Sequence, residues 1–240
     1  MIREEAIVPS PVDTPELAVM AKLMSARFCC RGFLSDPVPR SVVDRILTLA
    51  QLTASWCNSQ PWQVVITEGA GTERFRQALL DHARARPHSS PPQFDFPGPQ
   101  YTGAYLERRR EVGWQLYGSV GVVQGDRIGA ARQALENFRL FGAPHVAIIS
   151  TNQDLGVYGA VDCGAYVGNF VLLAQSLGIA SIPQAALAQF SPFVREYFRL
   201  GADRRIVCGI SFGYEDRAHA ANQFRTRRAN LDEAVTWVVD

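Results

Sequence analysis

The chain has 240 residues, 47% of them hydrophobic and 20% charged, and a formal net charge of +1. These values are ordinary for a folded soluble protein, and they give no electrostatic argument for binding nucleic acid or an anionic membrane. The start, MIREEAIVPS, lacks the apolar region of a signal peptide. The longest apolar stretch, residues 161–177, is interrupted by Asp162, Asn169 and Gln175. We therefore expect no membrane span and a cytoplasmic protein with reduced thiols.

The metal-ligating residue types are scattered along the chain. Cys29 and Cys30 are adjacent, but no C-x-x-C occurs among the five cysteines. The four histidines show no metal-ligand spacing with each other or with the cysteines. We therefore expect no metal site.

The first half of the chain alternates helical periodicity with one strand. Residues 14–26 and 35–52 place apolar side chains on one helical face each, and the second of these segments opens with prolines suited to a helix start. QVVIT, residues 63–67, is typical of a strand, and residues 72–85 form the next predicted helix. Residues 86–100 are rich in proline and serine and predict a loop.

The second half contains the most apolar segment. The further predicted elements are helices over residues 105–120, 126–141, 158–178 and 191–201 and strands over residues 145–151 and 204–214. The helix at 158–178 is apolar nearly all round and rich in Gly and Ala, which is typical of a buried helix. The segment 181–187, SIPQAAL, is either a place where a flat ligand approaches backbone N–H groups or an ordinary loop. The polar tail ends in a strand-like TWVV.

This order of elements indicates an α+β fold, a small central mixed sheet surrounded by helices. We find no internal repeat and no linker that would divide the chain. We therefore expect one domain over residues 1–240, in which residues 1–13 are flexible.

The segment GISFG, Gly209–Gly213, matches the nucleophile elbow of hydrolases. That motif requires a helix after the strand, and the YEDRAHAANQ that follows lacks apolar helical periodicity. The only later histidine, His219, is eight residues on. We therefore favour a closely packed strand in which small residues are needed.

The stretch SWCNSQPW, residues 55–62, places several short polar side chains between a helix and a strand. Ser55, Asn58 and Gln60 either satisfy carbonyl groups at the helix end or hydrogen-bond the edge of a planar heterocycle. From the residues alone these two readings are about equally supported.

Two pairs of arginines lie at opposite ends of the chain. Arg27 and Arg31 follow the first helix among aromatic residues, and Arg225 and Arg227 face the same way if the tail is extended. Guanidinium groups suit a phosphate monoester, so the pairs either form one phosphate clamp or are surface charge. No G-x-G-x-x-G follows a strand, which excludes a Rossmann nucleotide site.

Several ordered motifs together resemble the FMN-dependent nitroreductase family, from about residue 26 to residue 233. They are RFCCRGFLSDPVPR, S-x-x-N-S-Q-P-W, the Gly/Ala-rich helix with L-L-A-x-x-L-G-I before P-Q-A-A, and the tail motif N-x-x-R-T-x-R before L-D-E. The middle of the chain, with Tyr105, Tyr117, Asn137 and FGAP, is similar to the subgroup of nitrobenzoate and mycobacterial nitroreductases.

The resemblance implies a set of FMN-contacting residues: Arg27, Phe28, Cys29, Arg31, Ser55, Asn58, Gln60, Pro183, Gln184, Ala185, Arg225 and Arg227. Arg27 and Cys29 match the phosphate and ribityl contacts, and the backbone at Gln184 and Ala185 matches the turn against flavin N5. The family often has Arg and Ser where this chain has Phe28 and Cys29, and a thiol is a poorer hydrogen-bond partner than a hydroxyl.

The resemblance also implies an intertwined homodimer. In it Ser55, Asn58 and Gln60 reach the partner's flavin, and residues 214–240 form an arm that extends over the partner. The implied activity is FMN-dependent NAD(P)H oxidoreduction of nitroaromatic or quinone acceptors, by ping-pong hydride transfer and without a catalytic side chain. The alternatives are another flavin reaction, such as dehydrogenation or dehalogenation, and a non-catalytic flavin-binding protein. Tyr105, Trp114 and Tyr117 either wall the substrate pocket or belong to the core.

Overall fold

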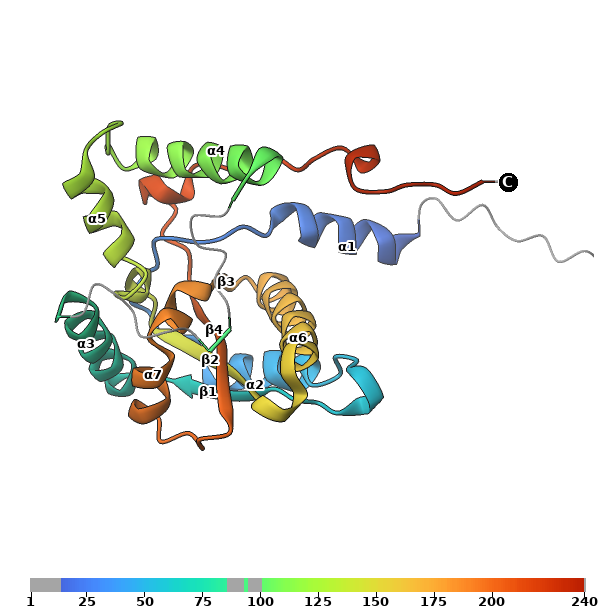
Figure 1. The fold of residues 1–240 in the computed structure, drawn as a ribbon, viewed down its shortest axis with the longest axis horizontal. Helices are drawn as coiled ribbons and strands as arrows, with labels where there is room; N and C mark the ends of the chain where they lie inside the picture. The colour runs from blue at the N-terminus through green and yellow to red at the C-terminus, as the bar shows by residue number, and fades with distance from the viewer. Residues whose placement is uncertain (1–13, 86–92, 95–100, 240) are drawn as a thin grey trace, which may run out of the picture.

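The computed structural model describes residues 14–85, 93–94 and 101–239 (Figure 1). The expected flexible segment 1–13 and most of the expected loop 86–100 lie outside the described residues. The helices are α1 (Pro15–Ala26), α2 (Arg40–Ala50), α3 (Ala70–Ala85), α4 (Gly103–Ser119), α5 (Arg127–Leu135), α6 (Gly156–Ser176) and α7 (Ser191–Tyr197). The strands are β1 (Gln63–Thr67), β2 (His145–Asn152), β3 (Ala180–Gln184) and β4 (Arg204–Gly213).

The four strands form one sheet in the order β1-β2-β4-β3, and every neighbouring pair is antiparallel. The parallel element is a single bridge between Cys29 and Ser181 at the outer edge of β3. The expected small sheet surrounded by helices is therefore present, with antiparallel pairing among its strands.

Two predictions about strands were wrong. The segment 180–184, where no strand is predicted, is β3, because pairing with β4 and the Cys29 bridge supplies the hydrogen bonds that its composition does not suggest. Pro183 is tolerated there because β3 is an edge strand. The strand-like TWVV at 236–239 has no strand partner among the described residues and forms no strand.

Alternation along β2 and β4 divides the core into two layers. Ala147, Ile149 and Phe212 face α2 and α6 on one side of the sheet. Val146 and Ile148 face α3, α7 and the short helix η4 (Ala185–Phe190) on the other side. Because side chains of a strand point alternately to opposite faces, each layer is filled by every second residue.

The long helix α6 is buried on one face only. Tyr166 and Phe170 pack into the core, and a Cβ placed on Gly159 would lie 2.5 Å from Thr151 Oγ1, so this glycine permits the close approach of helix and sheet. By length and composition alone the segment Gln153–Ser176 could cross a membrane, with a mean hydropathy of 1.4. Its outer face exposes Val157, Tyr158 and Val161.

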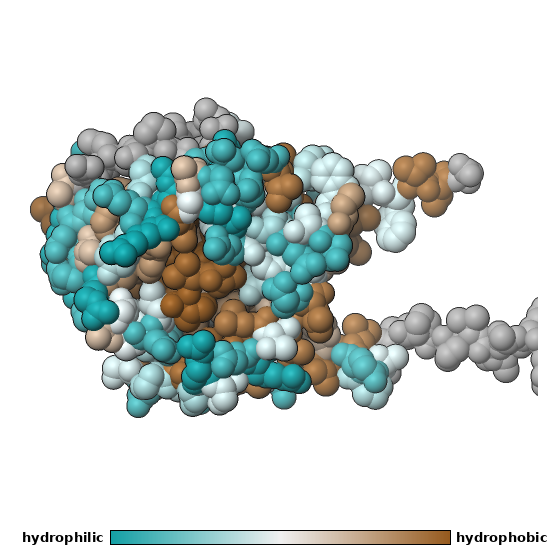
Figure 2. Space-filling model, turned by 90° about the horizontal axis from the view of Figure 1, so that it is seen from below, coloured by the Kyte–Doolittle hydropathy of each residue, from teal (hydrophilic) through white to brown (hydrophobic). Residues whose placement is uncertain are grey.

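Two segments project from the body on the same side. Figure 1 shows α1 and the C-terminal segment extending toward the right, and in Figure 2 the apolar tip of the C-terminal segment stands clear of the molecule. Helix α1 has no buried residue, and Trp237 and Val238 in the C-terminal segment are 77% and 90% exposed. Such contiguous exposed apolar groups are typical of a protein–protein interface.

Candidate functional site

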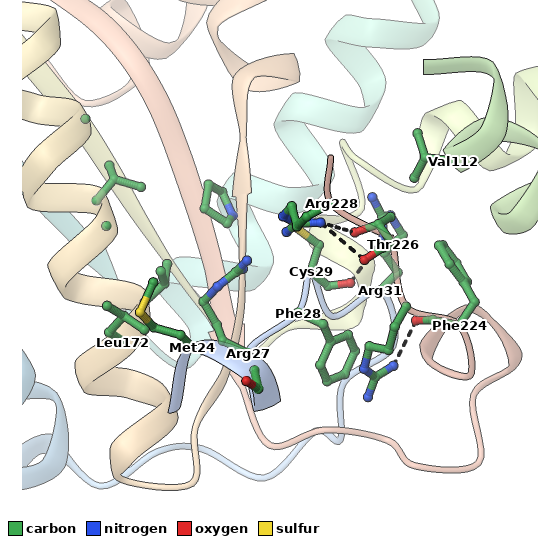
Figure 3. Close-up of a pocket in the computed structure, with 17 residues that line it drawn as sticks. Met24, Arg27, Phe28, Cys29, Arg31, Val112, Leu172, Phe224, Thr226 and Arg228 are labelled. Carbon is green, nitrogen blue, oxygen red and sulfur yellow. Dashed lines mark hydrogen bonds between the residues drawn. The ribbon is translucent and has the colours of Figure 1, made fainter. Parts of the chain in front are cut away.

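A cavity of about 840 Å³ lies where segments from both ends of the chain meet α6 (Figure 3). Its walls come from the end of α1, the segment 27–31, the C-terminal half of α6, the edge of β3, α4 and the tail segment 224–228. This volume is within the range of small-molecule and cofactor sites.

The segment 27–31 is fixed by its backbone. Helix α1 ends at Ala26, and Arg27 is extended, with φ −68° and ψ 132°. The Cys30 N–H donates to the Ser181 carbonyl at 3.2 Å, which attaches the segment to the edge of β3. The side chains of Arg27, Cys29 and Arg31 can therefore face the cavity while Cys30 is buried beneath them.

Asn222 joins this segment to the tail. Its Oδ1 accepts from the Arg31 N–H at 2.7 Å, and its Nδ2 donates to the carbonyls of Gly32 and Asp216 at 2.9 Å each. The residue is buried, at the end of the short helix η5 (Ala220–Asn222). Asn222 is the first residue of the tail motif N-x-x-R-T-x-R, and its place before the arginines is the only signal of it in the sequence.

The described residues lining the cavity include four arginines, Arg27, Arg31, Arg225 and Arg228, but no aspartate or glutamate. None of the four forms an ion pair with a carboxylate in the described part of the chain. Burial lowers the pKa of the Arg31 guanidinium from its ordinary value, because the charged form loses solvation. Unpaired guanidinium groups around one cavity create a site for an anion.

Of the two tail arginines predicted, Arg225 lines the cavity, and the other tail arginine on its wall is Arg228 and not Arg227. Arg225 lies over the Phe28 ring, 3.6 Å from its centroid, and Arg228 donates to Thr226 Oγ1 at 2.8 Å on the cavity wall (Figure 3). Arg227 is not brought to the cavity. Its side chain is 86% exposed and pairs with Glu111 of α4 at 3.4 Å.

The opposite wall is apolar and flat. Val167, Val171 and Leu172 on α6 face the cavity together with Pro183 of β3. No other heavy atom lies within 4 Å of a Cβ placed on Gly164 or Gly168, so this side of α6 presents bare backbone. A wall of this kind suits the face of a planar ligand.

The predicted turn at Gln184 and Ala185 begins beside this wall. Ala185 is exposed, whereas the Gln184 side chain is buried and its Oε1 accepts from Ser211 Oγ at 2.5 Å. Ser211 is therefore a buried partner inside β4, and no helix follows the strand. The interpretation of GISFG as a closely packed strand is confirmed: a Cβ on Gly209 would lie 2.4 Å from Leu187.

The polar loop 55–60 does not line the cavity. It folds around the short helix η1 (Trp56–Asn58), and the Asp162 carboxylate accepts from the Trp56 N–H at 3.3 Å. Ser55 Oγ accepts from the Gln60 N–H at 2.9 Å, and Gln60 Nε2 donates to Asn58 Oδ1 at 3.0 Å. Gln60 Oε1 also accepts from Gln51 Nε2 at 3.0 Å. None of the three side chains donates to a carbonyl of α2 among the hydrogen bonds of the described residues, so the isolated chain supports neither interpretation.

The aromatic candidates for a substrate wall also lie outside this cavity. Tyr105 is 70% exposed, so it does not belong to the core of the chain. Trp114 and Tyr117 line a separate hollow of about 470 Å³ between α4 and the start of α5.

Comparison with known proteins identifies similar chains over nearly the whole length. The model of the nitroreductase family matches residues 24–214. Nitroreductase NfnB of Mycolicibacterium smegmatis is 35% identical, over 93% of this chain and 95% of the relative. A 4-nitrobenzoate reductase of Pseudomonas putida is 31% identical, over 86% of this chain and 89% of the relative.

Solved structures give the same result for the fold. The FMN-dependent nitroreductase NfnB from Mycobacterium smegmatis in complex with NADPH superposes with a TM-score of 0.87 at 32% identity. The match covers 93% of this chain and all of the other. From the family match, these identities and the shared fold, the chain belongs to the nitroreductase family.

Proposed function

We propose that the protein is an FMN-dependent NAD(P)H oxidoreductase that reduces nitroaromatic or quinone-type acceptors. The observation that carries the proposal is the cavity lined by four arginines and, among its described residues, by no carboxylate. The FMN and NADPH dependence of the similar NfnB structures and the names of the nitrobenzoate reductases support it.

The residues present fit a flavin nucleotide with one phosphate. Arg27, Arg225 and Arg228 supply charge-assisted donors for a phosphate, and Cys29 lies among them. The half-buried Arg31 suits the electron-rich end of a heterocycle, and the flat wall of α6 suits its ring face. Arg227, which the resemblance also implies, would reach this set only if the tail took a different path after Asn222 and the pair with Glu111 were broken.

When bound, FMN supplies the chemistry, accepting a hydride from NAD(P)H and passing electrons to the acceptor at the same place. The chain would bind and orient the flavin, with Arg27, Arg225 and Arg228 holding its phosphate and the apolar wall of α6 available to its ring. The described cavity lining holds no histidine or carboxylate. We therefore assign no side chain as a general acid or base, and the proton source in this proposal is solvent or the flavin itself.

The proposal includes a homodimer whose partner completes the site. Apolar residues are exposed to solvent in the single chain on α1, on the outer face of α6 and on the C-terminal segment. A second copy that packs there would bury these surfaces and bring its own loop 55–60, with Ser55, Asn58 and Gln60, toward the flavin. Residues 214–240 would then serve as the exchanged arm.

We also place the protein in the cytoplasm. All five cysteines are free thiols, which suits a reducing compartment. Buried Cys208 and Cys163 have pKa values raised to about 12 and about 11 by burial, so they are unreactive at neutral pH.

The test is to purify the protein without added cofactor, record its visible spectrum and identify any released chromophore. We expect one FMN per chain, bleaching by NADH or NADPH without oxygen, and recovery of colour on adding a nitrobenzoate or a quinone. A colourless protein that takes up no FMN would overturn the proposal. Bound FMN that no nicotinamide reduces would instead support another flavin reaction or a non-catalytic flavin-binding protein.

A further inference from the structure

The buried amide of Gln184 connects three segments that are distant in sequence. Gln184 Oε1 accepts from Ser211 Oγ of β4 at 2.5 Å. Gln184 Nε2 donates to the Asn137 carbonyl at 2.9 Å and lies 3.4 Å from Asn137 Oδ1. Asn137 belongs to the turn after α5, so the amide holds the end of β3 between β4 and this turn.

The Gln184 amide is a polar group among mostly apolar side chains. Much of the layer between the sheet and α3 and α7 is apolar, with Leu187, Ile148 and Ile206 all fully buried. An apolar side chain of similar size would fill the same space without needing partners. A fully satisfied buried polar network fixes one conformation where an apolar contact would allow several.

The conformation fixed here is that of the peptide unit between Gln184 and Ala185. The Cys30 N–H donates to the Ser181 carbonyl, so the peptide groups of Ser181 face the outer edge of β3. These groups alternate along a strand, and Gln184 is still extended at φ −125° and ψ 94°. Pro183 and Ala185 therefore face the same edge, and since proline has no N–H, Ala185 supplies the next donor on that edge.

We propose that Gln184 is a positioning residue whose side-chain amide, held by Ser211 and Asn137, aims the Ala185 N–H at flavin N5. The proposal rests on the proposed function, because it requires bound FMN. The resemblance already implies a backbone contact with N5 at this turn. The new assignment is the positioning role of Gln184, whose own N–H faces β4 in the pair with Gly209. An N–H aimed at N5 donates to the lone pair of the oxidised ring, whereas the reduced ring carries a hydrogen on N5.

The first measurement uses the full-length protein loaded with FMN and compares Gln184→Leu with wild type. We expect oxidised FMN to lose about tenfold more affinity than reduced FMN, which corresponds to a midpoint potential about 30 mV higher for the two-electron couple. Ser211→Ala, which removes one of the partners, should give a smaller rise. Gln77→Leu on the exposed surface of α3 is the matched control and should leave the potential unchanged.

The double variant Gln184→Leu with Ser211→Ala separates positioning from simple stability. It removes both members of the buried hydrogen bond, so thermal stability of the flavin-free protein should return toward wild type. Water can serve the half-buried Asn137 carbonyl. We expect the raised potential to persist in this variant, because the Ala185 peptide is still unrestrained.

A wild-type potential in the double variant, with FMN bound normally, would overturn the positioning role and leave the proposed function intact. Wild-type protein that binds no FMN would overturn both. If Gln184→Leu does not fold, Ser211→Ala alone decides: a raised potential supports the proposal, and an unchanged one contradicts it.

Discussion

Segment 27–31 and loop 55–60 are both predicted to contact the flavin, but they differ in exposure and in how their side chains are hydrogen-bonded. Segment 27–31 is attached to β3 and to Asn222, and its arginines enter a cavity without carboxylate partners. Loop 55–60 is exposed, and its polar side chains bond to one another and to Asp162. The arginines of segment 27–31 therefore have charge available for a ligand, whereas the polar side chains of loop 55–60 already have hydrogen-bond partners in their own chain.

The backbones differ as well. In loop 55–60, Cys57, Asn58 and Gln60 adopt φ values of 51°, 54° and 46°, a region that costs residues other than glycine energy. Within 27–31 no residue has a positive φ. Loop 55–60 is exposed and does not line the cavity of its own chain. Its backbone strain would have a functional reason if the loop contributed residues to the cavity of another chain. The comparison therefore supports a site with one half in each subunit.

The largest expected effect is complementation between two defective subunits. Arg27→Ala and Asn58→Ala homodimers should each bind FMN at least about tenfold more weakly, because a charge-assisted or buried contact is lost. A heterodimer of the two, isolated with two different affinity tags, contains one site without either substitution. We expect roughly one tightly bound FMN per heterodimer.

Absence of tight binding in that heterodimer would mean that Arg27 and Asn58 act in the same chain. The control is a heterodimer of Arg27→Ala with Arg225→Ala, two residues that line the cavity of one chain. If both residues serve the cavity of their own chain, each chain of this control carries one defective site and no intact site remains. If the tail instead crosses to the partner's cavity, one site contains neither substitution and one tightly bound FMN should be retained.

The second prediction concerns the arginines of the tail. Arg225→Ala and Arg228→Ala should weaken FMN binding by about 10- to 100-fold, since hydrogen bonds to charged groups contribute about 1.5–3 kcal/mol. Arg227→Ala removes an exposed pair with Glu111 and should change affinity by less than about threefold. Fluorescence titration with FMN measures all three. A larger loss in Arg227→Ala than in Arg228→Ala would show that the tail turns differently when FMN is bound.

The third prediction contrasts the buried Cys30 of segment 27–31 with the exposed Cys57 of the loop. Burial raises the pKa of Cys30 from 9.0 to about 11. Its contribution to stability is therefore complete below pH 9 and is lost as pH rises toward 11, because the unfolded thiol ionises first. Unfolding in urea at several pH values should show a loss of up to about 1.4 kcal/mol per pH unit from this group.

Comparison with Cys30→Ala isolates the group. Its stability at pH 8 falls through lost packing, but the slope between pH 9 and pH 11 should be shallower than in wild type. Cys57→Ala is the matched control and should leave the slope unchanged, since Cys57 is exposed. Equal slopes in Cys30→Ala and wild type would contradict the burial argument.

The smallest expected effect is relief of strain in the loop. Glycine adopts the φ of 51° at Cys57 without a steric penalty. Part of this gain is offset by the greater freedom of glycine in the unfolded chain, so Cys57→Gly should stabilise the protein by about 0.5–1 kcal/mol. Thermal unfolding measures the gain. Cys57→Ala retains the Cβ and should show none, and an equal gain in both would rule out backbone strain.

The helices and most strands could be predicted because local patterns encode them. Residues 145–151 alternate between two apolar layers, and prolines 37 and 39 precede α2. The helices predicted over 126–141 and 191–201 were too long, since they end at Leu135 and Tyr197. Left-handed residues at Leu140, Phe141 and Arg199 then turn the chain, and none of these three is a glycine or an asparagine, the residue types that usually signal this conformation.

The residue types of the site could be predicted, but which individual residues line the cavity was harder to predict. Arg27, Arg31 and Arg225 line one cavity, but the sequence does not decide between Arg227 and Arg228. Asn222 appears in the sequence only as the first residue of the tail motif, and the partners of Gln184 had no local pattern that linked them to it. Ser211 belongs to a motif that suggested another chemistry, and Asn137 lies 47 positions from Gln184.

By itself the sequence determined where apolar faces, turns and clusters of guanidinium groups lie, because these follow from residue type and local spacing. Only the tertiary structure decided which of them meet. The Arg31–Asn222 hydrogen bond joins residues 191 positions apart, and β3 exists only because β4 and Cys30 bond to it. Contacts of this range depend on how the whole chain packs, and no local pattern records them.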